Sequence, residues 1–179
     1  MKIGFCGTVS VGKTTLVNEL QKLEEFKDYK IVTERSKYLR DLGIPLNTDS
    51  TIKGQTIFLA ERAAELMNEK IITDRTVIDV MAFTVKAESI SYDEFVAFEN
   101  HAQLLIEEYD HIFYVSPKGV EIEDNGIRET NSGFRDGIDV LVQYLLYRHR
   151  HKIKNITRLD GSTEERIKTI QDSLVPQYL

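Results

Sequence analysis

The chain has 179 residues, of which 41% are hydrophobic and 29% are charged, and its formal net charge at pH 7 is −6. This length and hydrophobic content are sufficient for one ordinary domain with a buried core, and residues 1–179 are expected to form a single domain. The acidic balance argues against a broad electrostatic grip on duplex nucleic acid and favours a small-molecule partner, although it is compatible with a local basic groove.

The sequence has the features of an intracellular protein. Its single cysteine, Cys6, cannot form an internal disulfide, and the chain begins in a strand pattern without a signal peptide. No apolar run approaches the roughly 20 residues that are needed to cross a bilayer. We therefore expect a cytoplasmic protein that is not inserted in a membrane, and a homodimer is compatible with the sequence.

The first expected strand, Ile3–Cys6, leads directly into a glycine-rich segment and then into a helical pattern with apolar residues at Leu16, Val17 and Leu20. The segment has the spacing G-x-x-x-x-G-K-[ST] in the strand–loop–helix context that this motif requires. We expect the following residues to bind the phosphates of a nucleoside triphosphate: Gly7, Thr8, Val9, Ser10, Val11, Gly12, Lys13, Thr14 and Thr15.

The residue types in this segment suit a polyphosphate. Glycines allow successive backbone N–H groups to turn toward an anion, which also lies at the positive end of a helix dipole. Lys13 can reach the β- and γ-phosphates, and the Thr14 hydroxyl can ligate Mg²⁺. The structural alternative is an incidental glycine-rich turn, and the flanking strand and helix argue against it.

Strand and helix patterns alternate along the rest of the chain. Further strands are expected at Lys30–Thr33, Ile71–Thr73, His111–Val115 and Ile156–Leu159. Helices are expected from Ile52 to near Glu69, from Val77 to about Glu88, after the capping pairs Ser91/Glu94 and Ser162/Glu165, and around Ile138–Leu146. This alternation predicts an α/β fold in which helices cover both faces of a parallel sheet.

Charged residues follow two of the expected strands directly: Glu34 and Arg35 after the second, Asp74 and Arg75 after the third. Because ligands of open α/β sheets bind at the carboxyl ends of the strands, these residues should share one cleft with the glycine-rich segment. Asp74 can position Mg²⁺, and either Glu34 or Asp74 can orient an attacking hydroxyl. Arg35 and Arg75 are suited to bidentate phosphate contacts. The alternatives are a helix N-cap for Asp74, a solvated first-turn residue for Glu34 and surface ion pairs for the arginines.

The polar segment 118–136 is long for a connection inside a domain, and loops of such length are usually functional or disordered. It contains Gly126 and Gly133 together with Arg128 and Arg135. We interpret it as a mobile lid whose arginines bring positive charge to a transferring phosphoryl group while the closed lid excludes water. The alternative is an exposed polar loop.

A further cluster of positive charge, Arg148–Lys152, lies near the end of an expected helix and includes His149 and His151. Cations at this position complement the negative end of the helix dipole. We therefore expect a solvated basic terminus here and not a metal site.

The stretch Ile71–Arg75, followed by Ala82–Thr84, resembles the Asp-Arg motif of thymidylate kinases and related nucleoside kinases. In those families the motif contacts the acceptor phosphate and the metal. The segment Phe58–Arg62 is similar to their preceding helix, in which an arginine faces the acceptor nucleotide. The resemblance implies this role for Arg62.

A second resemblance covers Tyr109–Val115 and Glu123–Arg128, which are similar to the ribosylnicotinamide kinase domain of bifunctional NAD-biosynthesis regulators. That family belongs to a wider set of small phage and bacterial P-loop proteins described as AAA-type ATPases. Its members carry an arginine lid after the fourth strand, and Arg128 and Arg135 occupy the matching places. The resemblances imply a P-loop NTPase three-layer sandwich with five strands in the order 2-3-1-4-5.

From the motifs and the resemblances we expect a kinase that uses ATP and Mg²⁺ and transfers the γ-phosphate to a nucleoside or a nucleoside monophosphate. The expected catalytic residues are Lys13, Glu34, Asp74, Arg128 and Arg135, with Thr14 and Asp74 toward the metal. The expected acceptor-binding residues are Glu34, Arg35, Arg62 and Arg75. Two alternatives stay open: a kinase that acts on a 5′-hydroxyl or modified base of nucleic acid, and a nucleotide switch or ATPase that controls a partner protein.

Overall fold

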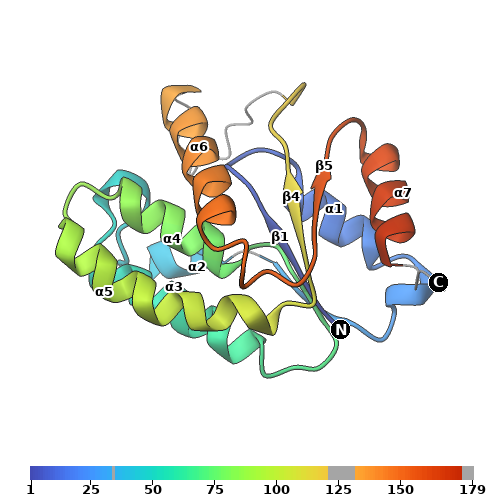
Figure 1. The fold of residues 1–179 in the computed structure, drawn as a ribbon, viewed down its shortest axis with the longest axis horizontal. Coiled ribbons are helices and arrows are strands. Elements are labelled where there is room, and N and C mark those ends of the chain that lie inside the picture. The colour runs from blue at the N-terminus through green and yellow to red at the C-terminus, as the bar shows by residue number, and fades with distance from the viewer. Residues whose placement is uncertain (34, 121–131, 175–179) are drawn as a thin grey trace.

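The computed structural model describes residues 1–33, 35–120 and 132–174 of the chain. Five strands form one parallel sheet in the order β2-β3-β1-β4-β5, so the expected strands and their order are confirmed (Figure 1). The strands are β1 (Lys2–Cys6), β2 (Lys30–Val32), β3 (Ile71–Thr73), β4 (His111–Val115) and β5 (Ile156–Leu159). The interior strands β3 and β4 are buried along their whole length, as expected for parallel strands that are covered on both faces.

The α-helices of the described ranges are α1 (Lys13–Leu20), α2 (Ser36–Asp41), α3 (Ile52–Glu65), α4 (Val77–Lys86), α5 (Tyr92–Ala102), α6 (Ser132–Arg148) and α7 (Thr163–Leu174). Short 3₁₀ helices are η1 (Glu24–Phe26), η2 (Asn47–Asp49) and η3 (Gln103–Glu108). In these ranges no helix combines the length and the apolar character that a bilayer crossing requires.

The helices form a layer on each face of the sheet. Helices α1 and α7 lie on one face, and α3, α4, α5 and α6 lie on the other (Figure 1). On the first face, Leu16 of α1 and Ile170 of α7 belong to one core cluster with Phe5 of β1. On the second face, α4 is buried from Val77 to Thr84, because it contacts α3, α5 and α6 in addition to the sheet. The expected three-layer α/β arrangement is therefore confirmed.

Three local expectations differ from the structure. Helix α3 ends at Glu65 and not near Glu69, and the Asn68 side chain donates a hydrogen bond to the Glu65 carbonyl at this end. Helix α6 already begins at Ser132, so the last part of the predicted lid 118–136 is helical. The expectation of a solvated terminus is wrong for His149, which is buried with its Nε2 3.0 Å from Oε1 of Glu99.

Gly4 in the middle of β1 lies where the layers of the molecule approach each other closely. It pairs with Thr73 of β3 and with Ile112 of β4. A Cβ atom at this position would lie 2.5 Å from Cγ2 of Thr76 and 2.7 Å from Cε1 of Tyr109. Thr76 and Tyr109 are both buried and have no room to move aside. The close contact of β1 with these two residues therefore requires glycine.

Gly4→Ala should therefore destabilise the protein by about 1–3 kcal/mol, the usual cost of overpacking a filled core. Gly137→Ala is the matched control, because it lies inside α6 and a Cβ there meets only the flexible end of Lys86 at 3.5 Å. That control should be neutral or stabilising by about 0.5–1 kcal/mol. Urea denaturation measures both changes, and equal stability of Gly4→Ala and wild type would contradict the packing argument.

Candidate active site

The glycine-rich segment forms a loop between β1 and α1 whose backbone requires its two motif glycines. Gly7 has φ 147° and Gly12 has φ 86°, conformations that residues with a Cβ atom adopt rarely. A Cβ at Gly7 would also lie 2.6 Å from the Val115 carbonyl oxygen. Gly12 is the N-cap of α1, and no described side chain caps this end of the helix. The N-terminal N–H groups of α1 are thus available for an anion.

A pocket with an empty volume of about 270 Å³, part of it open to solvent, lies at this loop. It is lined by residues 9–14 together with Asp74 and Arg75, which follow β3. The sheet therefore brings the loop and the Asp-Arg pair together at its carboxyl edge. This is the convergence that the strand order predicts, because β3 is the direct neighbour of β1.

Lys13 is only 6% exposed, and its ammonium lies within the loop. Nζ donates hydrogen bonds to the carbonyl oxygens of Gly7 and Thr8, each at 2.7 Å. Burial lowers the pKa of Lys13, and the nearby Asp79 carboxylate opposes this shift. A triphosphate in the pocket would offer stronger, charged acceptors for the same ammonium.

Thr14 and Asp74 meet directly across the pocket, with the Thr14 hydroxyl donating a hydrogen bond to Oδ2 of Asp74. Asp74 is 1% exposed, and its backbone N–H donates to the Val32 carbonyl of β2 at 3.0 Å. The N-cap of α4 is Thr76, so the alternative interpretation of Asp74 as a cap is wrong. Two hard oxygen donors, a hydroxyl and a carboxylate, are the ligand types that Mg²⁺ prefers.

Asp79 is a buried residue of the site that the analysis of the sequence did not identify. Its Oδ1 accepts a hydrogen bond from the Gly7 N–H at 3.1 Å. Its Oδ2 accepts from the backbone N–H of Thr76 at 2.8 Å and from the Thr76 hydroxyl at 3.0 Å. The pair Thr76/Asp79 has the spacing of a capping box, which is the signal that could have pointed to it.

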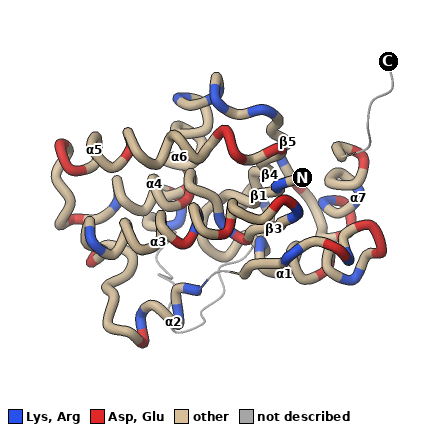
Figure 2. The backbone as a smooth tube through the Cα atoms, turned by 90° about the horizontal axis from the view of Figure 1, so that it is seen from below, with Lys and Arg blue, Asp and Glu red and all other residues tan. Residues whose placement is uncertain are grey.

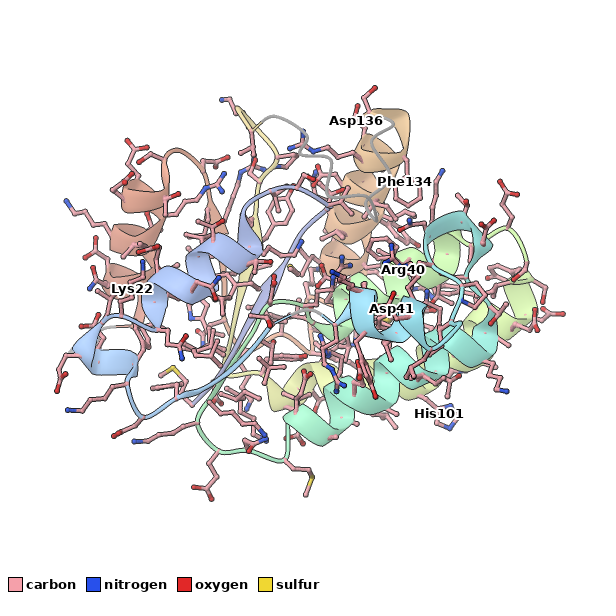
Figure 3. All side chains as sticks on the ribbon, turned by 180° about the vertical axis from the view of Figure 1, so that it is seen from behind. Lys22, Arg40, Asp41, His101, Phe134 and Asp136 are labelled. Atoms are coloured by element: carbon pink, nitrogen blue, oxygen red, sulfur yellow. The ribbon has the colours of Figure 1, made fainter. Side chains whose placement is uncertain are left out.

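Arg135, expected in the lid, lies in helix α6. Figure 3 labels its two neighbours in the chain, Phe134 and Asp136, at the start of this helix. Nη1 of Arg135 donates to the Val120 carbonyl at 2.8 Å and its Nη2 to the Pro117 carbonyl at 3.4 Å. Its own carbonyl accepts a hydrogen bond from the Thr8 hydroxyl at 2.7 Å. The Arg135 guanidinium thus bonds the backbone after β4, while the Arg135 carbonyl contacts the glycine-rich loop. Arg128 and Glu34 lie outside the described residues.

The other expected arginines lie at different distances from the loop pocket. Arg75 lines it and also lies over the Phe83 ring, with Cζ 4.8 Å from the ring centroid. Arg35 is exposed and forms an ion pair with Glu61 at 3.2 Å. Arg62 is buried and pairs with Glu65, whose pKa burial raises to about 7 against the effect of that arginine. The structure does not bring Arg62 to the pocket.

A second pocket, with an empty volume of about 370 Å³, adjoins the first at Arg75. Its wall includes the aromatic rings of Phe58 and Phe83 and the side chain of Gln55, which is 3% exposed. Further lining residues are Ser36, Leu46, Asn47, Ser50 and Val80. These residues lie in α2, η2, α3 and α4 or in the short segments that flank η2 and α4. No motif marks such a set, so sequence reasoning did not identify this pocket.

Comparison with known families agrees with this geometry. A protein family described as an AAA domain matches residues 2–166. The chain belongs to this family. No curated protein matches the sequence. The matched range of the AAA domain family includes the loop, the Asp-Arg pair and both pockets.

Solved structures show the same fold. Deoxyadenosine kinase from M. mycoides with bound dATP has a TM-score of 0.68 and 20% identity, over 97% of this chain and 99% of that one. NadR in complex with NR has a TM-score of 0.73 and 16% identity, over 96% of this chain and 50% of that one. NadR with NAD and AMP-PNP gives 0.69 and 14% identity, with 96% and 48% covered. This member of the AAA domain family thus has the fold of P-loop kinases and spans about half the length of NadR.

Lys13→Met should weaken ATP binding by about tenfold or more, because a hydrogen bond to a charged group contributes about 1.5–3 kcal/mol. The melting temperature should stay equal or rise, because the change removes a buried cation. Lys22→Met, after α1 on the surface, is the control and should change neither quantity (Figure 3). Titration calorimetry with ATP tests the loop assignment, and wild-type affinity in Lys13→Met would contradict it.

Proposed function

We propose that the protein is an ATP-dependent phosphotransferase that moves the γ-phosphate to a nucleoside or a nucleoside monophosphate. The observation that carries this proposal is the position of Arg75, which lines both the phosphate-loop pocket and the aromatic pocket. A donor in the first pocket and an acceptor in the second would meet at this guanidinium. Transfer between two bound substrates requires such adjacency, because most of its catalysis is positioning.

The first pocket supplies the donor site. Loop N–H groups and the start of α1 would bind the β- and γ-phosphates, and Lys13 would exchange its two carbonyl partners for phosphate oxygens. The oxygens of Thr14 and Asp74 would hold Mg²⁺ near them, directly or through water. When bound there, the ion would neutralise negative charge on the phosphates.

The second pocket has the chemistry of a nucleobase site. Its two phenylalanine rings can stack on a planar base, and the Gln55 amide offers one donor group and one acceptor for the edge of that base. Arg75 at the junction would then face the phosphoryl group or the 5′ end of the acceptor. Either Asp74 or Glu34 would orient the attacking hydroxyl of the acceptor.

The distribution of charge favours a small acceptor over nucleic acid. Lys and Arg are interspersed with Asp and Glu along the helices of the described chain (Figure 2). Two lysines of the α6–β5 connection are paired with acids, Lys152 with Glu107 and Lys154 with Asp110. A groove that tracks a nucleic-acid backbone needs unpaired positive charge along its length. The nucleoside kinase and the NadR structures with the same fold add support to a small acceptor.

A transfer screen with γ-labelled ATP tests the proposal. The acceptors are nucleosides, nucleoside monophosphates and oligonucleotides with a 5′-hydroxyl, and one reaction contains no acceptor. Labelled nucleotide product is the expected result. Label on oligonucleotides alone would support the nucleic-acid alternative, and release of phosphate without transfer would support an ATPase or switch.

Gln55→Leu should raise the KM of the acceptor found in this screen by about tenfold or more, because the base loses its hydrogen-bonding partner in a buried site. The KM of ATP should change by less than about twofold, since Gln55 lines only the second pocket. Gln171→Leu on α7, whose amide pairs with Glu25, is the control. Steady-state kinetics with both substrates varied gives the result, and an unchanged acceptor KM would remove Gln55 from the acceptor site.

Asp74→Asn should lower kcat by about a hundredfold and raise the Mg²⁺ concentration needed for half-maximal rate, because it removes a buried negative charge near the metal site. The fold should persist, since asparagine keeps an acceptor for the Thr14 hydroxyl. Asp28→Asn, in an exposed ion pair with Lys70, serves as control. Normal turnover of Asp74→Asn at limiting Mg²⁺ would limit this residue to a structural role.

A further inference from the structure

Arg166 of α7 is a buried cation that contacts the phosphate loop but does not line the loop pocket. Its side chain is almost fully enclosed, with 4% exposure of the residue. Nη1 donates a hydrogen bond to the Val11 carbonyl at 2.7 Å, and Nη2 donates to the Ser116 carbonyl at 3.1 Å. Nη1 also lies 3.6 Å from the place where a Cβ of Gly12 would be. One guanidinium therefore joins the loop to the end of β4.

The orientation of the Val11–Gly12 peptide follows from this contact. In a planar trans peptide the carbonyl and the N–H point in opposite directions. Because the Val11 carbonyl points to Arg166, the Gly12 N–H points away from it. Gly12 lines the loop pocket, whereas Arg166 does not. The contact thus turns this N–H to the side on which a phosphate would bind.

This peptide needs an external partner, because its own sequence selects its orientation weakly. Glycine adopts positive and negative φ with similar ease, so a rotation of the Val11–Gly12 peptide costs little at Gly12. No described side chain caps the start of α1. Arg166 provides the missing constraint. It also connects the peptide to the sheet, because it bonds the Ser116 carbonyl and the Ser116 N–H donates to the Leu159 carbonyl of β5 at 3.0 Å.

The cost of burying Arg166 indicates that the contact has a role besides stability. Burial lowers the pKa of Arg166, with the charge of Asp160 acting against this shift. The guanidinium bonds two neutral carbonyls, and its Nε has no partner among the described residues. A buried cation with such neutral partners contributes little net stability. The fixed positive charge of Arg166 next to the loop does favour an anion in the loop pocket.

We propose that Arg166 is a positioning residue for nucleotide binding, which fixes the Val11–Gly12 peptide so that the loop N–H groups face the phosphates. This inference rests on the donor half of the proposed function. It needs no acceptor, so binding measurements test it separately from phosphoryl transfer. The expected ligands are polyphosphates, with ATP and inorganic tripolyphosphate as the probes.

The test compares Arg166→Met with Lys168→Met, which removes an exposed cation from the same helix. Arg166→Met should weaken binding of both ATP and tripolyphosphate by about tenfold, which corresponds to about 1.4 kcal/mol, and the control should stay within about twofold. Arg166→Lys keeps the charge but reaches one carbonyl, and it should recover only part of the affinity. Calorimetry gives the affinities, and circular dichroism with thermal melting shows that each variant is folded.

Two results would overturn the positioning role. One is a folded Arg166→Met that binds both probes as wild type does, even if its melting temperature falls. The other is full recovery in Arg166→Lys, which would mean that charge alone suffices. If Arg166→Met does not fold, Arg166→Gln, whose amide can reach one carbonyl, is measured in its place. Wild-type binding of both probes by this variant would overturn the positioning role in the same way. Wild-type protein that binds neither probe would contradict the donor site itself and thus the proposed function.

Discussion

The carboxylate of Asp79 is the constraint on which both halves of the site depend. It is fully buried, and it accepts hydrogen bonds from the first residue of the phosphate loop and from Thr76, the N-cap of α4. A buried charge is tolerated when its lone pairs are satisfied in this way. Helix α4 carries Val80 and Phe83 into the second pocket. Asp79 therefore links the loop that lines the first pocket to the helix that lines the second, and its charge opposes the effect of burial on the pKa of Lys13.

A second connection runs through the start of α6. The Phe134 ring packs against Phe83, with their centroids 6.2 Å apart, and the neighbouring Arg135 carbonyl accepts the Thr8 hydroxyl. The Arg135 guanidinium bonds Pro117 and Val120, so this arginine holds the segment after β4 and does not face the loop pocket. The loop, the Phe83 side of the second pocket and the segment after β4 thus meet at Phe134 and Arg135. Close packing makes such elements shift together and not one by one.

Together with Arg166, these contacts surround the loop with buried polar groups that belong to other elements. Asp79 bonds its first residue, Arg135 bonds Thr8, and Arg166 bonds Val11. Buried polar contacts of this kind contribute little net stability but require one arrangement of their partners. They therefore constrain a loop whose Gly7 and Gly12 have positive φ. This preorganisation is what a phosphate site needs, since an ordered loop loses less entropy when its ligand binds.

The sequence by itself determined the five parallel strands, the phosphate loop and the meeting of this loop with Asp74 and Arg75. These features depend on local periodicity, on one dense motif and on the rule that parallel strands present their carboxyl ends at one edge. Only the tertiary structure decided the contact of Asp79 with Gly7, the partners of Arg166, the burial of His149 against Glu99 and the pocket around Gln55. The groups that meet there are far apart in the chain, as with Arg166 and Val11, and no local pattern encodes which distant backbone carbonyl a side chain will reach. Their positions follow from helix packing over the sheet, which depends on the shapes of all the side chains in the core.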